Sequence, residues 1–279
     1  VEEAAPRLRP GQLLVLRSTV YPCTSDWLAR RLGELGVAAQ VAFCPERIVQ
    51  GKAVEELRKL PQIVSGSSAE ALARASALFG RIAPSIVEMS PKEAEFAKLF
   101  ANAYRYIQFA VANQFYMLAH AAGVDFHRVH AGMKRDYPRL ADLPGAGFAA
   151  GPCLFKDTMQ LAAFSQNQFA LGHAATQINE GLVLFIVERV LAGFPLCDST
   201  VGLLGMAFKA DNDDIRSSLS YKLKKILEIR ARRVVATDPF VTVDPSLLPV
   251  EDVVAQSDLL ILCAPHSRYR GLDLKGKPV

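Results

Sequence analysis

Short apolar runs alternate with amphipathic stretches over residues 13–88 of the chain. The apolar runs predict strands at Leu13–Leu16, Ala39–Phe43, Ile63–Ser65 and Ile86–Glu88. The amphipathic stretches predict helices at Thr24–Leu35 and Ser68–Phe79, and a short turn is expected at Val54–Lys59. Strands that alternate with helices indicate an α/β sheet of parallel strands, with ligands bound at the strand carboxyl ends.

The apolar positions take on a helical period from Pro91 onward. Helices are predicted at Glu93–Ala122, Phe126–Lys134, Met159–Phe164 and Ala170–Leu191. The first of these would run for about eight turns. Such a length indicates a bridging or dimer-forming helix rather than an ordinary surface helix.

The α/β pattern resumes at Thr200. It predicts strands at Val201–Gly205, Arg233–Thr237 and Leu259–Leu262, separated by helices at Ser218–Ile229 and Val250–Gln256. We therefore predict two Rossmann-like parallel sheets, the first incomplete, joined by a helical central domain that contains the long helix. The expected domains are residues 1–89, 90–198 and 199–279.

Composition and charge narrow the class of protein. The 279 residues are 51% hydrophobic and 22% charged, with a net charge of +4, which fits a globular protein and makes nucleic acid an unlikely partner. The five cysteines are scattered without disulfide or metal-ligand spacing, so a reducing cytoplasm is the expected setting. No apolar run reaches the ~18 residues of a spanning helix, and the histidines form no metal motif. We expect neither a membrane nor a metal.

The segment Gly151–Asp157 holds the clearest candidate nucleophile. Cys153 follows a loop of small residues and precedes an apolar helix, so its sulfur would meet the free N–H groups of a helix N-terminus. Those groups and Lys156 both favour the thiolate form. The alternative interpretation is a small buried hydrophobic residue, the usual state of a free cysteine.

Four further segments, taken together with this one, form a recognisable pattern along the chain. They are Phe43–Ala53, Leu60–Gly66, the long helix with Lys98 and Asn102, and Phe208–Ser218 with its Phe208-Lys209 pair and Arg216. In this order and spacing the chain resembles the UDP-glucose/GDP-mannose dehydrogenase family, the nucleotide-sugar 6-dehydrogenases, from about Gly11 to its C-terminus.

The resemblance implies NAD-dependent, four-electron oxidation of a nucleotide-sugar C6 alcohol to the acid, through a cysteine thioester. Cys153 matches the family's nucleophile. Lys98 and Asn102 match its oxyanion donors. Glu46 matches the base for thioester hydrolysis, and Asp157 matches the aspartate that orients water.

The resemblance also assigns binding residues. The positions expected to contact NAD are Ser18, Thr19, Gln50, Lys156 and Arg216, although Lys156 is also a candidate for steering the thiolate. The positions expected to contact the nucleotide sugar are Arg47, Arg139, Gly147, Gly151, Phe208 and Lys209. Arg139 would reach the substrate of the partner in a homodimer.

No strand of the chain runs into G-x-G-x-x-G, the turn that cradles a dinucleotide pyrophosphate. Relative to the family, about 100 N-terminal residues of the NAD domain are not present, so we expect an internal fragment that does not reduce NAD by itself. Two alternatives stay open: a non-catalytic nucleotide-sugar-binding or dimerisation module, and another 6-phosphogluconate dehydrogenase-like oxidoreductase. The sugar also stays open, because residues 45–53 resemble the N-acetylhexosamine branch and residues 153–157 the UDP-glucose and GDP-mannose branch.

Overall fold

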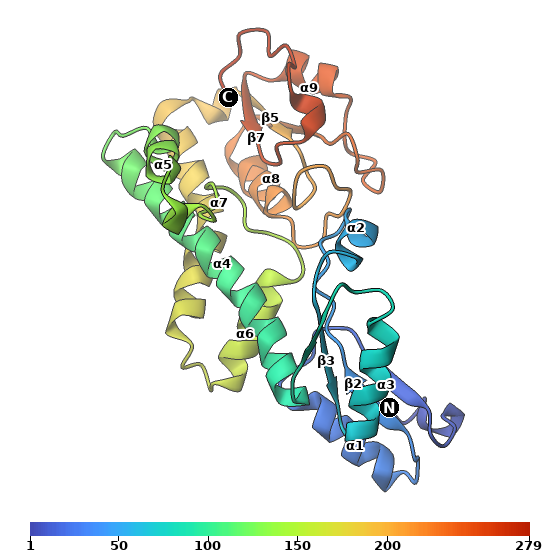
Figure 1. Ribbon diagram of the computed structural model, residues 1–279. Helices are drawn as coiled ribbons and strands as arrows, with labels where there is room; N and C mark the ends of the chain where they lie inside the picture. Colours follow the sequence, from blue (N-terminus) through green and yellow to red (C-terminus); the bar gives the residue numbers. More distant parts are fainter. The chain divides into compact units, whose positions relative to one another are not determined.

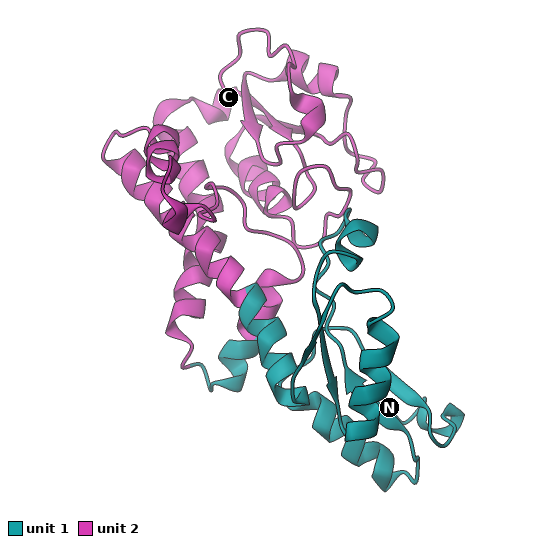
Figure 2. Cartoon of the chain, in the orientation of Figure 1, with its two compact units in different colours: residues 1–102, 160–167 teal, residues 103–159, 168–279 magenta.

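The computed structural model describes all residues, 1–279, and divides into two compact units (Figures 1 and 2). Unit 1 comprises residues 1–102 and 160–167, and unit 2 comprises residues 103–159 and 168–279. Two helices, α4 (Pro91–Ala121) and α6 (Leu154–Phe164), contribute residues to both units. The domain boundaries expected after residues 89 and 198 stay a prediction.

Unit 1 is built on a four-stranded sheet in the order β1-β2-β3-β4. Its strands are β1 (Leu13–Leu16), β2 (Gln40–Phe43), β3 (Gln62–Gly66) and β4 (Ile86–Glu88). The pairs β1–β2 and β3–β4 are parallel, as predicted, but β2 and β3 are antiparallel. The expectation of an entirely parallel sheet is therefore wrong at its centre.

The connection between β2 and β3 explains the antiparallel pair. Residues Val54–Lys59, expected to form a turn, mostly belong to the short helix α2 (Ala53–Leu57). The rest of the connection, residues 44–61, is irregular, so it holds no helix long enough to cover a face of the sheet as a parallel crossover usually does. Strand β3 therefore starts at the sheet edge where β2 ends.

Two helices cover opposite faces of this sheet. Helix α1 (Thr24–Glu34) buries Leu28 and Leu32 in a cluster with Val41, whereas helix α3 (Ala69–Phe79) packs against the neighbouring residue Ala42. Successive residues of a strand point to opposite faces, so the two helices lie on different sides. Ser68, expected to be the first helical residue, is instead the N-cap of α3, and its Oγ accepts a hydrogen bond of 3.0 Å from the N–H of Ala71.

Unit 2 combines helices with a second sheet. Its helices include α5 (Phe126–Lys134), α7 (Ala170–Gly193), α8 (Leu219–Arg230) and α9 (Val250–Gln256). The sheet has the order β6-β5-β7, with β5 (Thr200–Leu204), β6 (Arg233–Thr237) and β7 (Leu259–Leu262), and both strand pairs are parallel. This confirms the parallel sheet predicted for the C-terminal part.

Neighbouring residues of β5 face two separate apolar cores. Leu203 packs with Leu223 and Leu227 of α8, and Leu204 packs with Val253 of α9. Because adjacent strand residues point to opposite faces, α8 and α9 cover the two sides of the sheet. The sheet is thus enclosed between the two helices, and loops follow the carboxyl ends of its strands.

Helix α7 is the most apolar helix of the chain. An 18-residue window of it has a mean hydropathy of 1.2, so by length and composition alone it is long and apolar enough to cross a membrane, contrary to the expectation from the apolar runs of the sequence. In the structure, however, Val183 and Val187 pack in the same cluster as Leu203 and Leu223. Helix α7 is thus part of the core that joins helices and sheet within unit 2.

Candidate active site

Cys153 lies immediately before the first residue of α6 and is exposed. The helix begins at Leu154, five residues earlier than the apolar pattern indicated. The Cys153 carbonyl accepts the first helical hydrogen bond, 2.9 Å from the N–H of Asp157. The structure therefore places the thiol at a helix N-terminus, in contact with solvent, and the alternative of a buried hydrophobic cysteine is wrong.

The residues before Cys153 pack on the loop that joins β5 to α8, residues 205–218. Gly151 has a φ of 101°, and a Cβ atom built on it would lie 2.7 Å from a ring carbon of Phe208. Its N–H also donates to the carbonyl of Ser217 at 3.4 Å. Only glycine fits here without displacing the ring, which brings the cysteine segment and Phe208 together as one site.

One charged side chain, that of Arg216, lies near the thiol. Arg216 pairs with Asp214, with Nη2 2.6 Å from Oδ2. The pKa of Arg216 is raised mainly by its hydrogen bonds to Asp214, with a smaller contribution from the nearby Cys153 sulfur. The guanidinium therefore lies within electrostatic range of the Cys153 sulfur.

Lys156 and Asp157 form an ion pair one turn into α6. Lys156 Nζ lies 2.9 Å from Asp157 Oδ1, and the Asp157 carboxylate is completely buried while Lys156 is half-exposed. A buried carboxylate requires such a partner. Lys156 therefore compensates the charge of Asp157, and its role toward the Cys153 thiol stays a prediction.

A buried asparagine pair, which no motif of the sequence indicates, fixes the loop before Cys153. Asn113 of α4 accepts from the N–H of Gly147 at 2.8 Å and donates to the carbonyl of the same residue at 3.0 Å. Its amide also donates to Asn179 of α7 at 2.9 Å, and Asn179 donates to the Tyr106 carbonyl at 3.0 Å. Both asparagines are fully buried, so Gly147 has an anchored backbone.

In unit 1, Glu46 is held by an arginine clamp at the edge of the sheet. Arg17, directly after β1, forms an ion pair with Glu46 and donates to Gln62 at 3.0 Å. The other carboxylate oxygen of Glu46 accepts from the N–H groups of Arg47 and Ile48 at 2.8 and 2.9 Å. Both oxygens are oriented, and the Glu46 side chain keeps 41% of its surface exposed.

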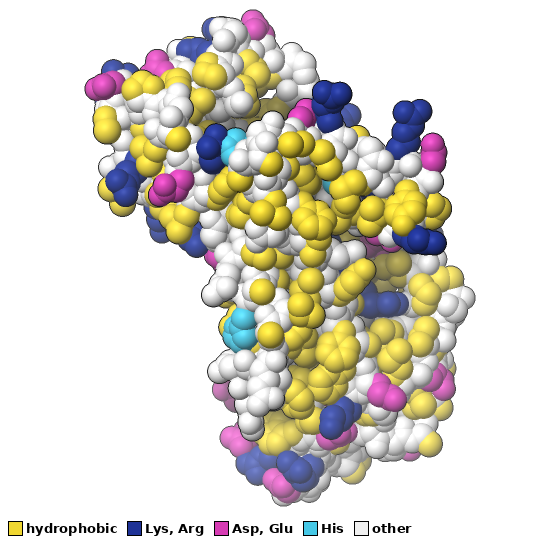
Figure 3. Space-filling view, turned by 90° about the vertical axis from the view of Figure 1, so that its left-hand side faces the viewer, with side chains coloured by type: hydrophobic (Ala, Val, Ile, Leu, Met, Phe, Trp, Pro, Cys, Tyr) yellow, Lys and Arg dark blue, Asp and Glu magenta, His cyan; other side chains and the backbone are white.

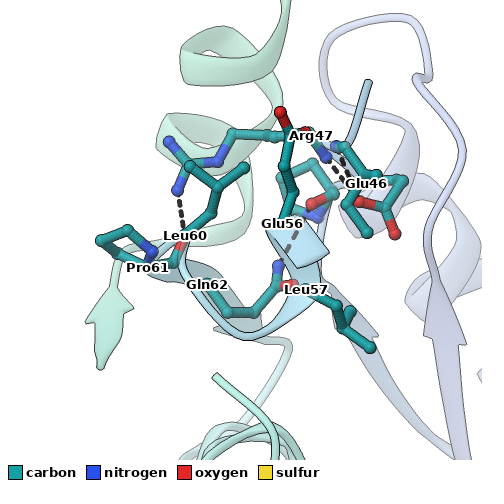
Figure 4. Close-up of a pocket in the computed structure, with 9 residues that line it drawn as sticks. Glu46, Arg47, Glu56, Leu57, Leu60, Pro61 and Gln62 are labelled. Carbon is teal, nitrogen blue, oxygen red and sulfur yellow. Dashed lines mark hydrogen bonds between the residues drawn. The ribbon is translucent and has the colours of Figure 1, made fainter. Parts of the chain in front are cut away.

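The adjacent hollow is small. It measures about 10 Å³, the room that one water molecule needs, and is lined by residues of the β2–β3 connection. Figure 4 shows the Arg47 side chain extended toward Pro61, whose carbonyl it contacts, and away from the Glu46 carboxylate. Arg47, expected to bind substrate, is bonded to its own loop in this structure.

Lys98 and Asn102 lie on one face of α4, one turn apart, and Asn102 is buried. One turn before Lys98, the buried Glu95 accepts hydrogen bonds from the N–H of Cys23 at 2.5 Å and of Ser25 at 2.7 Å. Glu95 thereby caps α1. This role could not be predicted from the sequence, because nothing there distinguishes Glu95 from the nearby Glu93. The N-terminus of α1 is thus occupied by a carboxylate and does not provide a pyrophosphate site.

The remaining expected residues divide between the units. Ser18, Thr19 and Gln50 lie in unit 1 with Glu46, Lys98 and Asn102, and the cysteine segment lies in unit 2 with Arg139, Phe208 and Lys209. Arg139 is exposed, and its guanidinium lies 5.6 Å from the ring centre of Tyr137. The convergence of Glu46 and Lys98 on Cys153 stays a prediction.

Comparison with known proteins decides the family. Three domain profiles match in order: the NAD binding domain at residues 1–83, the central domain at residues 92–181 and the UDP binding domain at residues 202–277. The chain belongs to the UDP-glucose/GDP-mannose dehydrogenase family. The suspected resemblance is confirmed, and the family's NAD binding domain makes NAD its cofactor.

Individual relatives agree with this assignment. The UDP-N-acetyl-D-mannosamine dehydrogenase of Pyrococcus horikoshii is 30% identical over 277 residues, covering 94% of this chain and 65% of that protein. The one from Methanocaldococcus jannaschii is 26% identical, covering 98% and 64%. This chain therefore spans about 65% of the length of these curated relatives.

Solved structures support the same fold. The UDP-D-ManNAc dehydrogenase of Pyrococcus horikoshii superposes with a TM-score of 0.89 at 28% identity, covering 98% of this chain and 67% of that one. A UDP-glucose dehydrogenase from Pyrobaculum islandicum gives 0.84 at 28% identity, covering 95% and 66%. The α/β fold with a helical central part is thus shared with nucleotide-sugar dehydrogenases.

Proposed function

We propose that this chain carries the thiol and the nucleotide-sugar site of an enzyme that oxidises a nucleotide-sugar C6 alcohol to the acid. The observation that supports it best is the packing of Gly151 on Phe208, because it joins the exposed Cys153 to the UDP binding domain. We take a UDP-linked N-acetylhexosamine as the substrate, in line with the names of the most similar relatives.

Phe208 and Lys209 would hold the nucleotide end of the substrate. Lys209 Nζ lies 5.9 Å from the centre of the Phe208 ring, so an apolar surface and an ammonium group stand side by side. Such a pair suits a ligand that combines a sugar with phosphates. The C6 end would then point toward Gly151 and Cys153.

Cys153 would act once the alcohol has become an aldehyde. Its thiolate adds to the C6 carbonyl carbon, the carbonyl oxygen becomes an alkoxide, and loss of hydride from C6 restores the carbonyl as a thioester. NAD would supply the hydride acceptor for both oxidations, and Ser18, Thr19 and Gln50 are proposed to contact it. Lys98 and Asn102 are proposed to donate to the oxygen at the stage where it carries negative charge.

Hydrolysis would release the acid and regenerate the thiolate. Water attacks the thioester carbon and loses a proton, and the carbon–sulfur bond breaks. We propose Glu46 as the group that takes the proton, since both of its oxygens are oriented and the side chain remains accessible. Asp157, buried and paired with Lys156, would orient the water.

A homodimer is proposed through α4. Its exposed apolar residues recur at helical spacing and form one stripe: Phe100, Tyr104, Val111, Phe115 and Leu118. Figure 3 shows hydrophobic side chains gathered on the face where α4 is exposed. A self-complementary stripe on a long helix is a common basis for a two-fold interface.

The product stoichiometry of the complete enzyme tests this function. Oxidation of a C6 alcohol to an acid yields two NADH per sugar acid, whereas oxidation of a hydroxy acid to a ketone yields one and leaves no acid at C6. A ratio of one would favour the 6-phosphogluconate dehydrogenase-like alternative. If the chain binds UDP-sugars but the complete enzyme forms no NADH with any of them, the non-catalytic module is favoured.

A further inference from the structure

A buried aspartate–histidine pair lies behind the loop of residues 205–218. Asp238 follows β6 and His266 follows β7, and both side chains are inaccessible to solvent. His266 Nε2 lies 2.9 Å from Asp238 Oδ2. Neither residue belongs to the site described above, although an ionisable pair without solvent contact is costly to retain.

The bonds around the imidazole determine its protonation. His266 Nδ1 lies 2.9 Å from the backbone nitrogen of Asp211, which is a donor only. Nδ1 therefore presents its lone pair, and the ring proton sits on Nε2, where it is donated to Asp238. His266 is a neutral imidazole that accepts on one side and donates on the other.

Both members of the pair hold the same loop. Asp238 Oδ2 accepts from the N–H groups of Met206 and Ala207 at 2.7 and 2.9 Å. Further along, Asp211 is fixed at its N–H by His266 and at its carboxylate by Ser267, whose N–H and Oγ donate at 2.7 and 2.9 Å.

The segment between these anchors carries Phe208 and Lys209. Asp211 has a left-handed φ of 53°, a conformation that an aspartate adopts at a cost unless its surroundings hold it. A loop fixed at Met206–Ala207 and at Asp211 leaves the intervening residues little freedom. Phe208 in turn contacts Gly151, so the constraint extends to the segment that ends at Cys153.

We infer that His266 is a positioning residue, which fixes the nucleotide-sugar-binding loop through the bond from the Asp211 N–H to its Nδ1. The inference rests on the proposed function of Phe208 and Lys209. A purely structural role predicts something different, namely that His266 matters only as the buried partner of Asp238.

Two substitutions separate these roles. In His266→Asn the amide oxygen stands near the position of Nδ1 and still accepts from Asp211, whereas the bond to Asp238 is lost. In His266→Gln the amide nitrogen stands near Nε2 and still donates to Asp238, whereas Asp211 loses its acceptor. Arg268→Ala serves as the control, because Arg268 is exposed, adjoins the pair, and contacts the Pro239 carbonyl and the Phe240 ring, which lie outside the loop.

The measurements are UDP binding by calorimetry, hydrogen exchange of the amides of residues 207–214, and the thermal midpoint. For His266→Gln we expect UDP affinity to fall about tenfold, the scale of one lost buried acceptor, with faster exchange in the loop. His266→Asn should bind UDP and exchange its loop amides close to the parent chain even if its midpoint drops. Arg268→Ala should match the parent chain in all three.

The outcomes distinguish this inference from the proposed function. If the parent chain does not bind UDP, the proposed function is overturned. The difference in loop hydrogen exchange between His266→Gln and His266→Asn still tests the role of His266. If His266→Gln exchanges its loop amides as slowly as the parent chain, the positioning role is wrong. The role is equally wrong if the loss of UDP affinity in His266→Asn and His266→Gln simply follows the fall in their thermal midpoints.

Discussion

At the scale of single residues, the environment of each cysteine separates a reactive thiol from inert ones. Cys153 is exposed at a helix N-terminus, whereas Cys44 is fully buried at the end of β2. Burial raises the pKa of the Cys44 thiol to about 11, although a hydrogen bond with Ser65 and the charge of Arg17 oppose the effect. The two thiols should therefore differ in access to reagents, and the Cys44 thiol should resist ionisation.

Alkylation of the folded chain should show this difference. With limiting iodoacetamide at pH 8, we expect Cys153 to be modified and Cys44 to remain free until the protein unfolds. Peptide mapping by mass spectrometry gives the result for each position. Cys197, which is exposed and lies in the single 3₁₀ turn Leu196–Asp198, is the internal reference for accessibility. Faster labelling of Cys197 than of Cys153 would contradict an activated Cys153.

The buried Asn113 clamp gives a second test at this scale. Asn113→Asp replaces the amide donor by an acceptor that faces the Gly147 carbonyl and the Asn179 oxygen. The substitution should lower the free energy of unfolding by about 2–3 kcal/mol, because the buried acceptors lose their donor. Urea denaturation measures it, with Gln108→Ala, at a half-buried position of the same helix, as the control. A loss below about 0.5 kcal/mol would mean that the clamp contributes nothing beyond an ordinary surface contact.

At the scale of elements, apolar periodicity predicted strands and helices well but not their pairing. The bounds of β4, α5, β6, α9 and β7 are those expected from the sequence, because each is a clear run between turn residues. The antiparallel β2–β3 pair and helix α2 were missed, since strand direction depends on the path of the connection and not on the strand residues. The early start of α6 was missed because Lys156, Asp157 and Thr158 separate its first two apolar residues from the apolar run that begins at Met159.

The candidate site was predictable only in part for a similar reason. Cys153, Gly151 and Phe208 were found through a family motif, and the structure brings them together. Asn113 and His266 were not found, because a buried polar residue looks like a surface polar residue in a sequence. Their roles arise from partners that are distant along the chain.

The Asp238 anchor predicts a pH dependence of unit 2. Burial disfavours the Asp238 anion, but the hydrogen bonds from His266 and from the backbone outweigh it and lower the pKa from 3.8 to about 2. Above about pH 4 the carboxylate is ionised in both folded and unfolded chains, so its stabilisation is complete. Between about pH 4 and pH 2 the unfolded chain binds the proton first, and this stabilisation is lost.

Urea denaturation from pH 5 to pH 2 tests whether the free energy of unfolding falls with acid as expected. The free energy of unfolding should fall less steeply with acid in Asp238→Asn than in the parent chain, since the variant has no carboxylate to titrate there. Equal slopes would mean that Asp238 is not held in its charged form by the fold.

At the scale of the whole molecule, the stripe on α4 predicts assembly. Phe115 is 41% exposed and Leu118 is 58% exposed, which is unfavourable for apolar side chains on an isolated chain. Light scattering should give twice the chain mass, and Phe115→Glu should shift it toward the monomer by placing a charge in the interface. His127→Glu on the neighbouring α5 is the control for added charge. A parent chain that remains monomeric at high concentration would remove the proposed dimer.

The most direct test of the account is Cys153→Ser in the complete enzyme, with product acid and NADH measured alongside UDP-sugar binding. A serine hydroxyl is scarcely ionised at neutral pH and forms no thioester, so acid formation should cease. Binding should stay unchanged, because the loop bonds made by Gly151 involve only the backbone. A serine variant that forms the sugar acid at close to the parental rate would contradict the central role of Cys153.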